Sequence, residues 1–283
     1  MSSEKIATKI VELIRQHFPW GQRDCPPRPA DDDPIVVEKS ATGWIKNRVN
    51  STSLESTALA LHARIQAVVE EMQDQLPPNE RSRFFYRSDL THLMKSPESI
   101  LDKMAREWEA GKGKAPRVGF DDFAESMDDL ARFRIVLNFL ADVEIVCVKL
   151  EEPYKVAPGG RSRLTPKQQA LYNDFALRDH CLEDLIMLGP KDRLSGERCR
   201  KGVFSLRKDG LVRVEVQIQT MLQEAWDKKD HFLVYEPRRR GEDVEPCHSI
   251  EIYAMSELLY VADLTFDRLL DIIRKRRSGG GGD

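Results

Sequence analysis

The sequence predicts an α/β (α+β) protein, in which a β-sheet is flanked by helices and further helices lie towards both ends of the chain. Within Leu211–Thr220, apolar and polar residues alternate strictly from Val212 to Gln219, which is typical of a strand with one face in a core. A second short apolar stretch, Val203–Arg207, precedes it across Lys-Asp-Gly, which favours a hairpin. Apolar stripes at helical spacing over Ser53–Leu76 and Ile250–Ile273 predict two long helices.

Bulk composition limits the class of protein. The 283 residues suffice for a good core, and 32% charged against 41% hydrophobic residues are typical of a globular chain rich in surface helices. A net charge of -3 excludes a global basic field for nucleic acid. There is no apolar run of membrane-spanning length and no secretion signal, and the five cysteines are scattered without a C-x-x-C pair. We therefore expect a cytoplasmic protein with reduced thiols and no membrane partner.

The N-terminal region, residues 1–79, is predicted to be a helical extension. Ser3–His17 carries apolar residues at helical spacing, whereas proline and aspartate over residues 22–34 favour a loop. Residues 35–52 have no decisive pattern. The helix over Ser53–Leu76 should end there, because Pro77 and Pro78 follow it.

One helix start is sharply signalled within KSPESILDKM, residues 95–104. Ser96 suits the N-cap, Pro97 the first helical position and Glu98 the first turn. This helix should run to about Ala110, because two glycines follow closely.

A second helix is predicted over Phe120–Ala131 and should lead directly into a strand at Phe133–Phe139. Asp129 lies at that junction. Val143–Leu150 is apolar with interspersed charges, which favours a further helix.

The section from Glu152 to Gly196 is harder to assign, because proline, glycine and basic residues dilute the pattern. Thr165–Phe175 is helix-like and Leu182–Met187 is a possible strand, so we expect an insertion or a mobile segment over the site. After the hairpin, Thr220–Tyr235 is predicted to be helical. The tail SGGGGD, residues 278–283, should be flexible.

The polar face of the 211–220 strand is unusual, because it carries a single carboxylate among an arginine and two amides. Glu215 is the carboxylate, and Arg213, Gln217 and Gln219 are its neighbours on that face. Two interpretations stay open: an ordinary solvent-facing edge, or a functional face.

If the strands at 133–139 and 211–219 are sheet neighbours, Asp129 and Glu215 would be able to share a divalent ion. Two carboxylates with waters suit Mg²⁺, which is usually completed by substrate phosphates. Lys95 stands before a helix N-terminus, which attracts anions, and Ser99 and Lys103 lie one turn apart on that helix. Together these residues indicate phosphoryl or pyrophosphoryl transfer.

Each of these residues also has a plainer interpretation, which stays open. Lys95 would then be a solvated side chain, Ser96 a simple cap and Asp129 a helix-end acid.

Four stretches in order resemble the synthetase domain of the RelA/SpoT-type alarmone synthetase family. They are KSPESILDKM (95–104), DLARFRI (129–135), VEVQIQT (214–220) and EAWDKKDHFLVYE (224–236). The resemblance covers roughly residues 80–240, and a C-terminal helix is expected over 241–277. It implies a nucleotidyltransferase-like mixed sheet flanked by helices. It also implies transfer of the pyrophosphate of ATP to the ribose 3′-hydroxyl of GTP or GDP with Mg²⁺.

The resemblance also implies roles for particular residues. Asp129 and Glu215 match the Mg²⁺ carboxylates, and Glu215 or Gln217 would touch the acceptor ribose. The residues that match the ATP-binding side of the family are Lys95, Ser99, Lys103, Arg134 and His231. For His231 the alternative is packing beside the aromatic residues around it.

This chain departs from the family at several motif positions. Leu93 and Gln219 stand where the family usually has arginines, and Arg132 stands where it has a glycine. The family's G-Y-x-S-x-H segment, whose tyrosine stacks on the acceptor guanine, has no clear counterpart where Arg198–Phe204 lies, and the replacement is basic.

These departures leave two further interpretations beside the first one. Some toxic small relatives pyrophosphorylate the 3′ end of tRNA, which a local basic surface would help to hold. A catalytically silent nucleotide- or RNA-binding relative is the third possibility. No His-Asp dipeptide occurs, so the hydrolase domain of the long relatives is not expected, and we expect a small stand-alone synthetase. The long terminal helix also leaves a homo-oligomer open.

Overall fold

A six-stranded mixed sheet forms the centre of the computed structural model, which describes residues 3–22, 24–30, 32–111, 118–187, 196–239 and 242–279. The strands are β1 (Phe85–Asp89), β2 (Arg132–Leu137), β3 (Phe175–Leu177), β4 (Glu183–Asp184), β5 (Arg200–Leu206) and β6 (Asp209–Thr220). Their order is β1-β2-β6-β5-β3, with β4 paired to β5. β2 and β6 are parallel and the other pairs are antiparallel. The predicted mixed sheet flanked by helices is confirmed.

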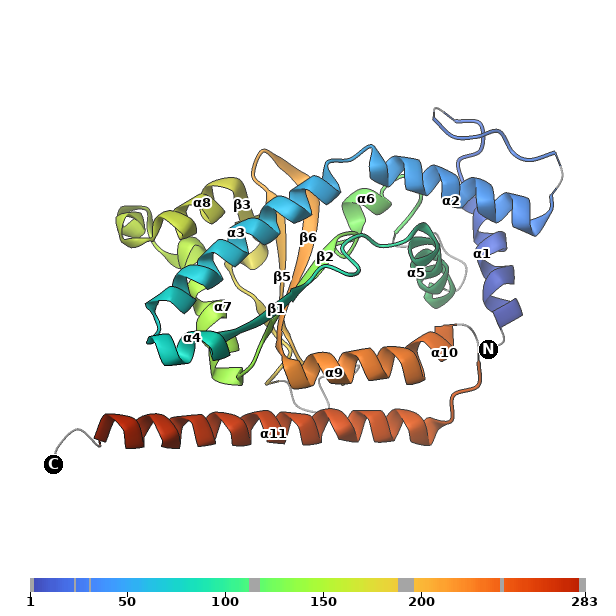
Figure 1. Cartoon of the computed structure of the whole chain (residues 1–283). Helices are drawn as coiled ribbons and strands as arrows, with labels where there is room; N and C mark the ends of the chain where they lie inside the picture. The colour runs from blue at the N-terminus through green and yellow to red at the C-terminus, as the bar shows by residue number, and fades with distance from the viewer. Residues whose placement is uncertain are drawn as a thin grey trace.

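Four helices precede or flank the first strand: α1 (Ser3–His17), α2 (Pro34–Asn50), α3 (Leu54–Gln75) and α4 (Pro78–Phe84). The predicted helices over 3–17 and 53–76 are confirmed. Residues 35–52, which had no decisive pattern, are mostly helical, because the Asp33 side chain caps α2 at the Ile35 N–H and Pro34 fixes the first turn. α3 runs across the sheet, whereas α1 and α2 lie beside α5 (Figure 1).

α5 (Pro97–Ala110) begins and ends as predicted. The Ser96 hydroxyl accepts a hydrogen bond from the Ser99 N–H at 3.2 Å, and Pro97 opens the helix. The sequence signal was strong here because the cap, the proline and the first-turn acid are all local.

The predicted helix over 120–131 is wrong in extent, since only α6 (Phe123–Ser126) is helical. The Asp122 carboxylate accepts from the Gly119 N–H and the Ser126 hydroxyl, and such local side-chain bonds compete with helix continuation. Beyond α6 the chain instead pairs with residues 93–95 through backbone hydrogen bonds. Asp129 therefore lies in a turn before β2 and not at the end of a helix.

The predicted strand over 133–139 is confirmed as β2, and the apolar stretch after it is α7 (Leu140–Lys155). The described part of the 152–196 section also contains η1 (Pro158–Arg163), α8 (Pro166–Asp174) and η2 (Arg178–His180). This part is built into the fold and is not an insertion, because β3 pairs with β5 and the Tyr154 hydroxyl donates to the Phe175 carbonyl at 3.2 Å. The possible strand over 182–187 is shortened to β4, and residues 188–195 lie outside the described residues.

The predicted β5–β6 hairpin is confirmed, and the helix predicted over 220–235 is present as α9 (Met221–Asp230) and the π-helix η3 (His231–Tyr235). α10 (Glu236–Arg239) continues it. α11 (Pro246–Gly279) extends beyond both ends of the helix predicted over Ile250–Ile273, but it begins after the start of the C-terminal helix expected over 241–277. α11 lies along α9 (Figure 1). The Asp263 carboxylate of α11 accepts from the Thr220 hydroxyl at 2.6 Å, which ties α11 to the start of α9.

No helix in the described part of the chain is both long and apolar enough to cross a membrane. All five cysteines belong to the described part of the chain, and all are free thiols.

Candidate active site

The pairing of β2 with β6 brings the predicted site residues onto neighbouring strands. Arg132 lies opposite Glu215 and Arg134 opposite Gln217 in the parallel ladder. The supposition that the two strands are sheet neighbours is therefore correct.

The polar face of β6 is not a solvent-facing edge. β6 lies between β2 and β5, and Glu215, Gln217 and Gln219 are only 4%, 2% and 2% exposed. Buried polar groups in the middle of a sheet usually have specific partners. Among the described residues the buried Nε2 of Gln219 has no hydrogen-bond partner, whereas Glu215 and Gln217 both have partners. Those partners define the candidate site.

Asp129 lies between two lysines from the α5 region. Its two carboxylate oxygens accept separately from Lys95 Nζ at 2.6 Å and Lys103 Nζ at 2.8 Å. Burial alone would raise the pKa of Asp129, but the two ammonium groups hold it well below its usual range. Burial lowers the pKa of Lys95, against the opposing attraction of Asp129. The expected metal carboxylate and the expected phosphate lysines are thus ion-paired with each other.

Glu215 has a lysine partner of its own. Lys201 Nζ on β5 lies 3.0 Å from Glu215 Oε2. Burial opposes the charge of Lys201, but Glu215 and Glu197 outweigh it and raise the pKa of this lysine above its ordinary value. Each expected metal carboxylate is therefore neutralised by at least one lysine.

Gln217 bridges two carboxylates. Its Nε2 donates to Glu215 Oε1 at 3.0 Å and to Glu197 Oε1 at 3.2 Å. Its Oε1 accepts from Arg134 Nε at 2.8 Å, and Arg134 also pairs with Asp227 of α9 at 2.8 Å. Because a donor and two acceptors hold the two ends of the amide, its orientation is fixed.

Sequence reasoning missed Glu197. It precedes β5 as an acid within a basic stretch, and nothing in its spacing indicates that it meets Gln217. Burial raises the pKa of Glu197, and the nearby Asp227 and Glu215 add to the effect against Lys201 and Arg134. Glu197 meets Gln217 only because β5 and β6 pair in the observed register, which the sequence pattern does not reveal.

Two cavities meet at Asp129. The first, which we call the α5 cavity, has a volume of about 730 Å³, and its lining includes six of the predicted or newly found site residues: Lys95, Ser99, Lys103, Arg134, Glu197 and His231. The second, the β5 cavity, has a volume of about 750 Å³ and is lined by Lys201, Val203 and Glu215 among others. Asp129 and Lys103 line both cavities. The structure thus brings most predicted residues to one cavity and Glu215 to the adjoining one.

His231 begins the π-helix η3 at the rim of the α5 cavity. Its side chain is 48% exposed, its Nε2 lies 3.4 Å from Glu236 Oε1, and its ring lies 5.1 Å from the Tyr235 ring. It is therefore not a core packing residue, although it contacts an aromatic neighbour. Short π-helical turns are frequent at functional sites.

The donor set fits a magnesium ion. Mg²⁺ is usually held by one or two carboxylates together with waters and substrate phosphates, and Asp129 and Glu215 both line the β5 cavity. The lysines now paired with these carboxylates would have to move their ammonium groups onto phosphate oxygens for the ion to enter.

No protein-family model matches the chain, and a search of curated proteins found no match. Several solved structures are similar in fold, two of which are described here. Small alarmone synthetase 2 from Bacillus subtilis superimposes with a TM-score of 0.51 at 19% identity, covering 80% of this chain and 97% of that one. Small alarmone synthetase 1 from Bacillus subtilis bound to AMPCPP gives a TM-score of 0.50 at 15% identity, covering 82% and 98%. The chain therefore has the fold of the small alarmone synthetases.

Proposed function

We propose that the chain is a RelA/SpoT-type enzyme that transfers the pyrophosphate of ATP to the 3′-hydroxyl of a guanosine nucleotide, GTP or GDP, with Mg²⁺. The observation that carries this proposal is the position of Asp129, between the two lysines of the α5 cavity and on the wall of the Glu215 cavity. A phosphate donor and a hydroxyl acceptor in adjoining cavities would meet at this carboxylate. The fold supports the same reaction class.

On the donor side, Lys95, Lys103 and the start of α5 would bind the ATP phosphates. Both ammonium groups already converge on the two oxygens of one carboxylate, so they are spaced to hold a second oxyanion nearby. The positive end of the α5 helix dipole also favours negative charge at this start. The bound AMPCPP of small alarmone synthetase 1 from Bacillus subtilis is consistent with an ATP-like donor for this fold.

Magnesium, held by Asp129 and Glu215, would neutralise charge on the transferred group. Gln217 would keep Glu215 in place, because its amide donates to that carboxylate while Arg134 holds its oxygen. Phosphoryl transfer needs positioning and charge neutralisation more than covalent help, which is what these fixed polar groups supply.

On the acceptor side, β5 retains part of the family's G-Y-x-S-x-H pattern, contrary to the expectation that this segment has no clear counterpart here. The strand and its turn carry Gly202-Val203-Phe204-Ser205-Leu206-Arg207, with the glycine and serine at the same spacing. Gly202 is required by packing, because a Cβ there would collide with Leu182. Val203 lies directly opposite Glu215 and stands where the family has the stacking tyrosine.

One observation favours the tRNA 3′ end as an alternative acceptor: no aromatic side chain lines the β5 cavity within the described part of the chain. The three basic residues of this lining, Lys103, Arg178 and Lys201, are outnumbered by six acidic ones, so it is the absence of a ring for stacking on a free base that carries this alternative. In the catalytically silent alternative, Lys95 and Lys103 would stay paired with Asp129, and Lys201 with Glu215, so that no metal ion could bind these carboxylates.

One experiment distinguishes the three possibilities. The protein is incubated with Mg²⁺, ATP labelled in its β and γ phosphates, and a panel of GTP, GDP, ATP, AMP and bulk tRNA. Label on GTP or GDP supports the proposal, and label on RNA supports the tRNA alternative. ATP binding in calorimetry without transfer to any acceptor would leave only the silent relative.

A further inference from the structure

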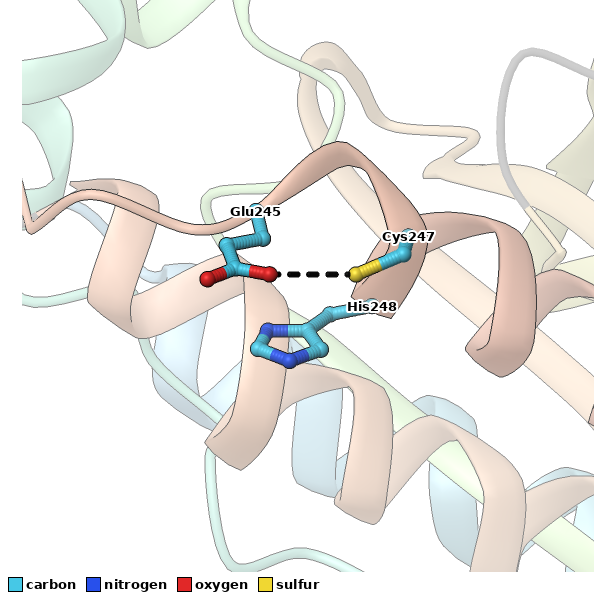
Figure 2. Close-up of side chains that lie close together, drawn as sticks. All are labelled: Glu245, Cys247 and His248. Atoms are coloured by element: carbon cyan, nitrogen blue, oxygen red, sulfur yellow. Dashed lines mark hydrogen bonds between the residues drawn. The ribbon is translucent and has the colours of Figure 1, made fainter.

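A group of potential metal ligands lies outside both cavities, at the start of α11. The side chains of Glu245, Cys247 and His248 point towards one another there (Figure 2). Their ligand atoms all lie within 4.8 Å of one another. Among the described residues this is the one set of three or more histidine, cysteine and acidic side chains that meets this criterion.

The geometry of the group comes from one turn of chain. Glu245 precedes α11, and its carbonyl accepts from the His248 N–H at 3.1 Å, which places the three side chains on one side of the turn. The Cys247 thiol donates to Glu245 Oε2 at 3.3 Å, as the dashed line in Figure 2 marks. A proton therefore now occupies the position between sulfur and oxygen where a cation would bind.

The side chains can close the remaining distance. Metal bonds of 2.0–2.3 Å in a tetrahedral site put ligand atoms about 3.5 Å apart. All three residues are exposed, so rotamer changes can shorten the separations without disturbing a core.

The ligand chemistry selects the ion. Thiolate, imidazole and carboxylate together suit zinc, whereas Mg²⁺ and Ca²⁺ prefer an all-oxygen set. We propose that Glu245, Cys247 and His248 bind one Zn²⁺ ion, with water as the fourth ligand. On binding, the Cys247 thiol releases its proton to solvent, and thiolate plus carboxylate balance the charge of the ion.

The site would act on the connection between α10 and α11. The Glu242 N–H donates to the Pro237 carbonyl at 2.8 Å, and Arg238 donates to the Ser249 hydroxyl, so Glu242 and the start of α11 already contact α10. Glu236, one residue before Pro237, lines the α5 cavity. A bound zinc ion would fix the start of α11 near the part of the α5 cavity that Glu236 lines, and this effect does not depend on catalysis at Asp129.

The test uses the rate at which Cys247 is alkylated, read by peptide mass spectrometry, in buffered submicromolar free Zn²⁺ and in chelator. Cys181 is also exposed and provides an internal control in the same molecule, and excess Mg²⁺ is present to compete with zinc in the β5 cavity that Cys181 lines. Zinc should slow alkylation of Cys247 by roughly tenfold or more and leave Cys181 unchanged, because a metal-bound thiolate is a poor nucleophile. E245Q and H248A should each remove most of the protection.

A zinc titration against a chromophoric chelator gives the stoichiometry. One equivalent per chain should bind to wild type and to C181S, and none with comparable affinity to C247S. Equal protection of both cysteines, protection that survives H248A, or no protection at all would each overturn the site. Matching circular dichroism of all variants excludes unfolding as the cause.

Discussion

The α5 cavity and the β5 cavity share Asp129 but are built from different kinds of residues. The α5 cavity combines a helix start and two lysines with the aromatic residues Trp226 and Tyr235. The β5 cavity is lined by charged and small side chains, and Val203 lies opposite Glu215. Charged side chains line both cavities, whereas aromatic side chains line only the α5 cavity among the described residues. Under the proposed function, this difference means that the groups for phosphate transfer would be better preserved in this chain than those for recognition of an acceptor base.

The two cavities also differ in how their carboxylates are fixed. Asp129 is held by Lys95 and Lys103 of the α5 region, one on each carboxylate oxygen, at 2.6 and 2.8 Å. Glu215 is held by a lysine and by the bridging amide of Gln217. The first arrangement can exchange lysine for phosphate, and the second keeps its carboxylate in place whether or not Lys201 moves.

The largest effect is expected where the cavities meet. Asp129→Asn and Glu215→Gln should each lower transfer by roughly a hundredfold or more, because each removes a charge that the metal and the phosphates require. Initial rates of labelled product measure the effect, and thermal melting checks the fold. Wild-type rates in either variant would remove that residue from the mechanism.

The next largest effect should come from the polar group that joins the cavities. Glu197→Ala removes one acceptor of the Gln217 amide and should lower kcat by roughly tenfold with little change in KM for ATP, since Gln217 would be held less firmly beside Glu215. Glu197→Gln keeps an oxygen acceptor and should recover most of the rate. A loss in Glu197→Gln as large as in Glu197→Ala would mean that the charge matters more than the hydrogen bond.

The acceptor side can be changed by adding the missing ring. Val203→Tyr should lower KM for GTP or GDP by roughly fivefold, because base stacking contributes about 1–3 kcal/mol. KM for ATP should stay unchanged, and Val203→Leu provides a control for size without a π-face. If Val203→Tyr weakens GTP use but leaves transfer to tRNA intact, the acceptor is not a free guanine nucleotide.

The smallest effect on activity is expected far from both cavities, at Asp263. Burial raises the pKa of Asp263 to about 7, despite the hydrogen bond from Thr220, and nearby Asp267 adds to the rise. A carboxyl whose folded pKa exceeds its unfolded value of about 3.9 stabilises the fold while protonated, so stability falls as the pH rises through about 7.

Asp263→Asn should remove this loss. Its free energy of unfolding should change less between pH 5 and pH 8 than that of wild type, by about 2 kcal/mol, in denaturant titrations. Asp271→Asn, at an exposed position on the same helix, is the control and should follow wild type. Identical pH slopes for Asp263→Asn and wild type would show that Asp263 is ionised in the folded protein.

Local signals in the sequence predicted much of the fold. The α5 start, the β5–β6 hairpin and the long α3 and α11 helices depend on caps, turns and periodicity within a few residues. β1 was missed, because its five residues gain their pairing from β2, which lies more than forty residues further along the chain. The helix over 120–131 was overextended, since the hydrogen bonds that pull residues 130–132 into an extended form come from residues 93–95.

The candidate site divides in the same way. Asp129, Glu215 and the lysines stood out because residue type and spacing carry their chemistry. Glu197 and Lys201 gave no such signal, because their contacts with Gln217 and Glu215 exist only once β5 pairs with β6 in the observed register.

The most direct measurement is ³¹P NMR of the wild-type protein with Mg²⁺, ATP and GDP. If the two cavities form one centre for pyrophosphoryl transfer, AMP and a nucleotide 3′-diphosphate should appear in equal amounts, and both should vanish together in Glu215→Gln. ADP with inorganic phosphate as the products, or AMP formation that persists without Glu215, would contradict it.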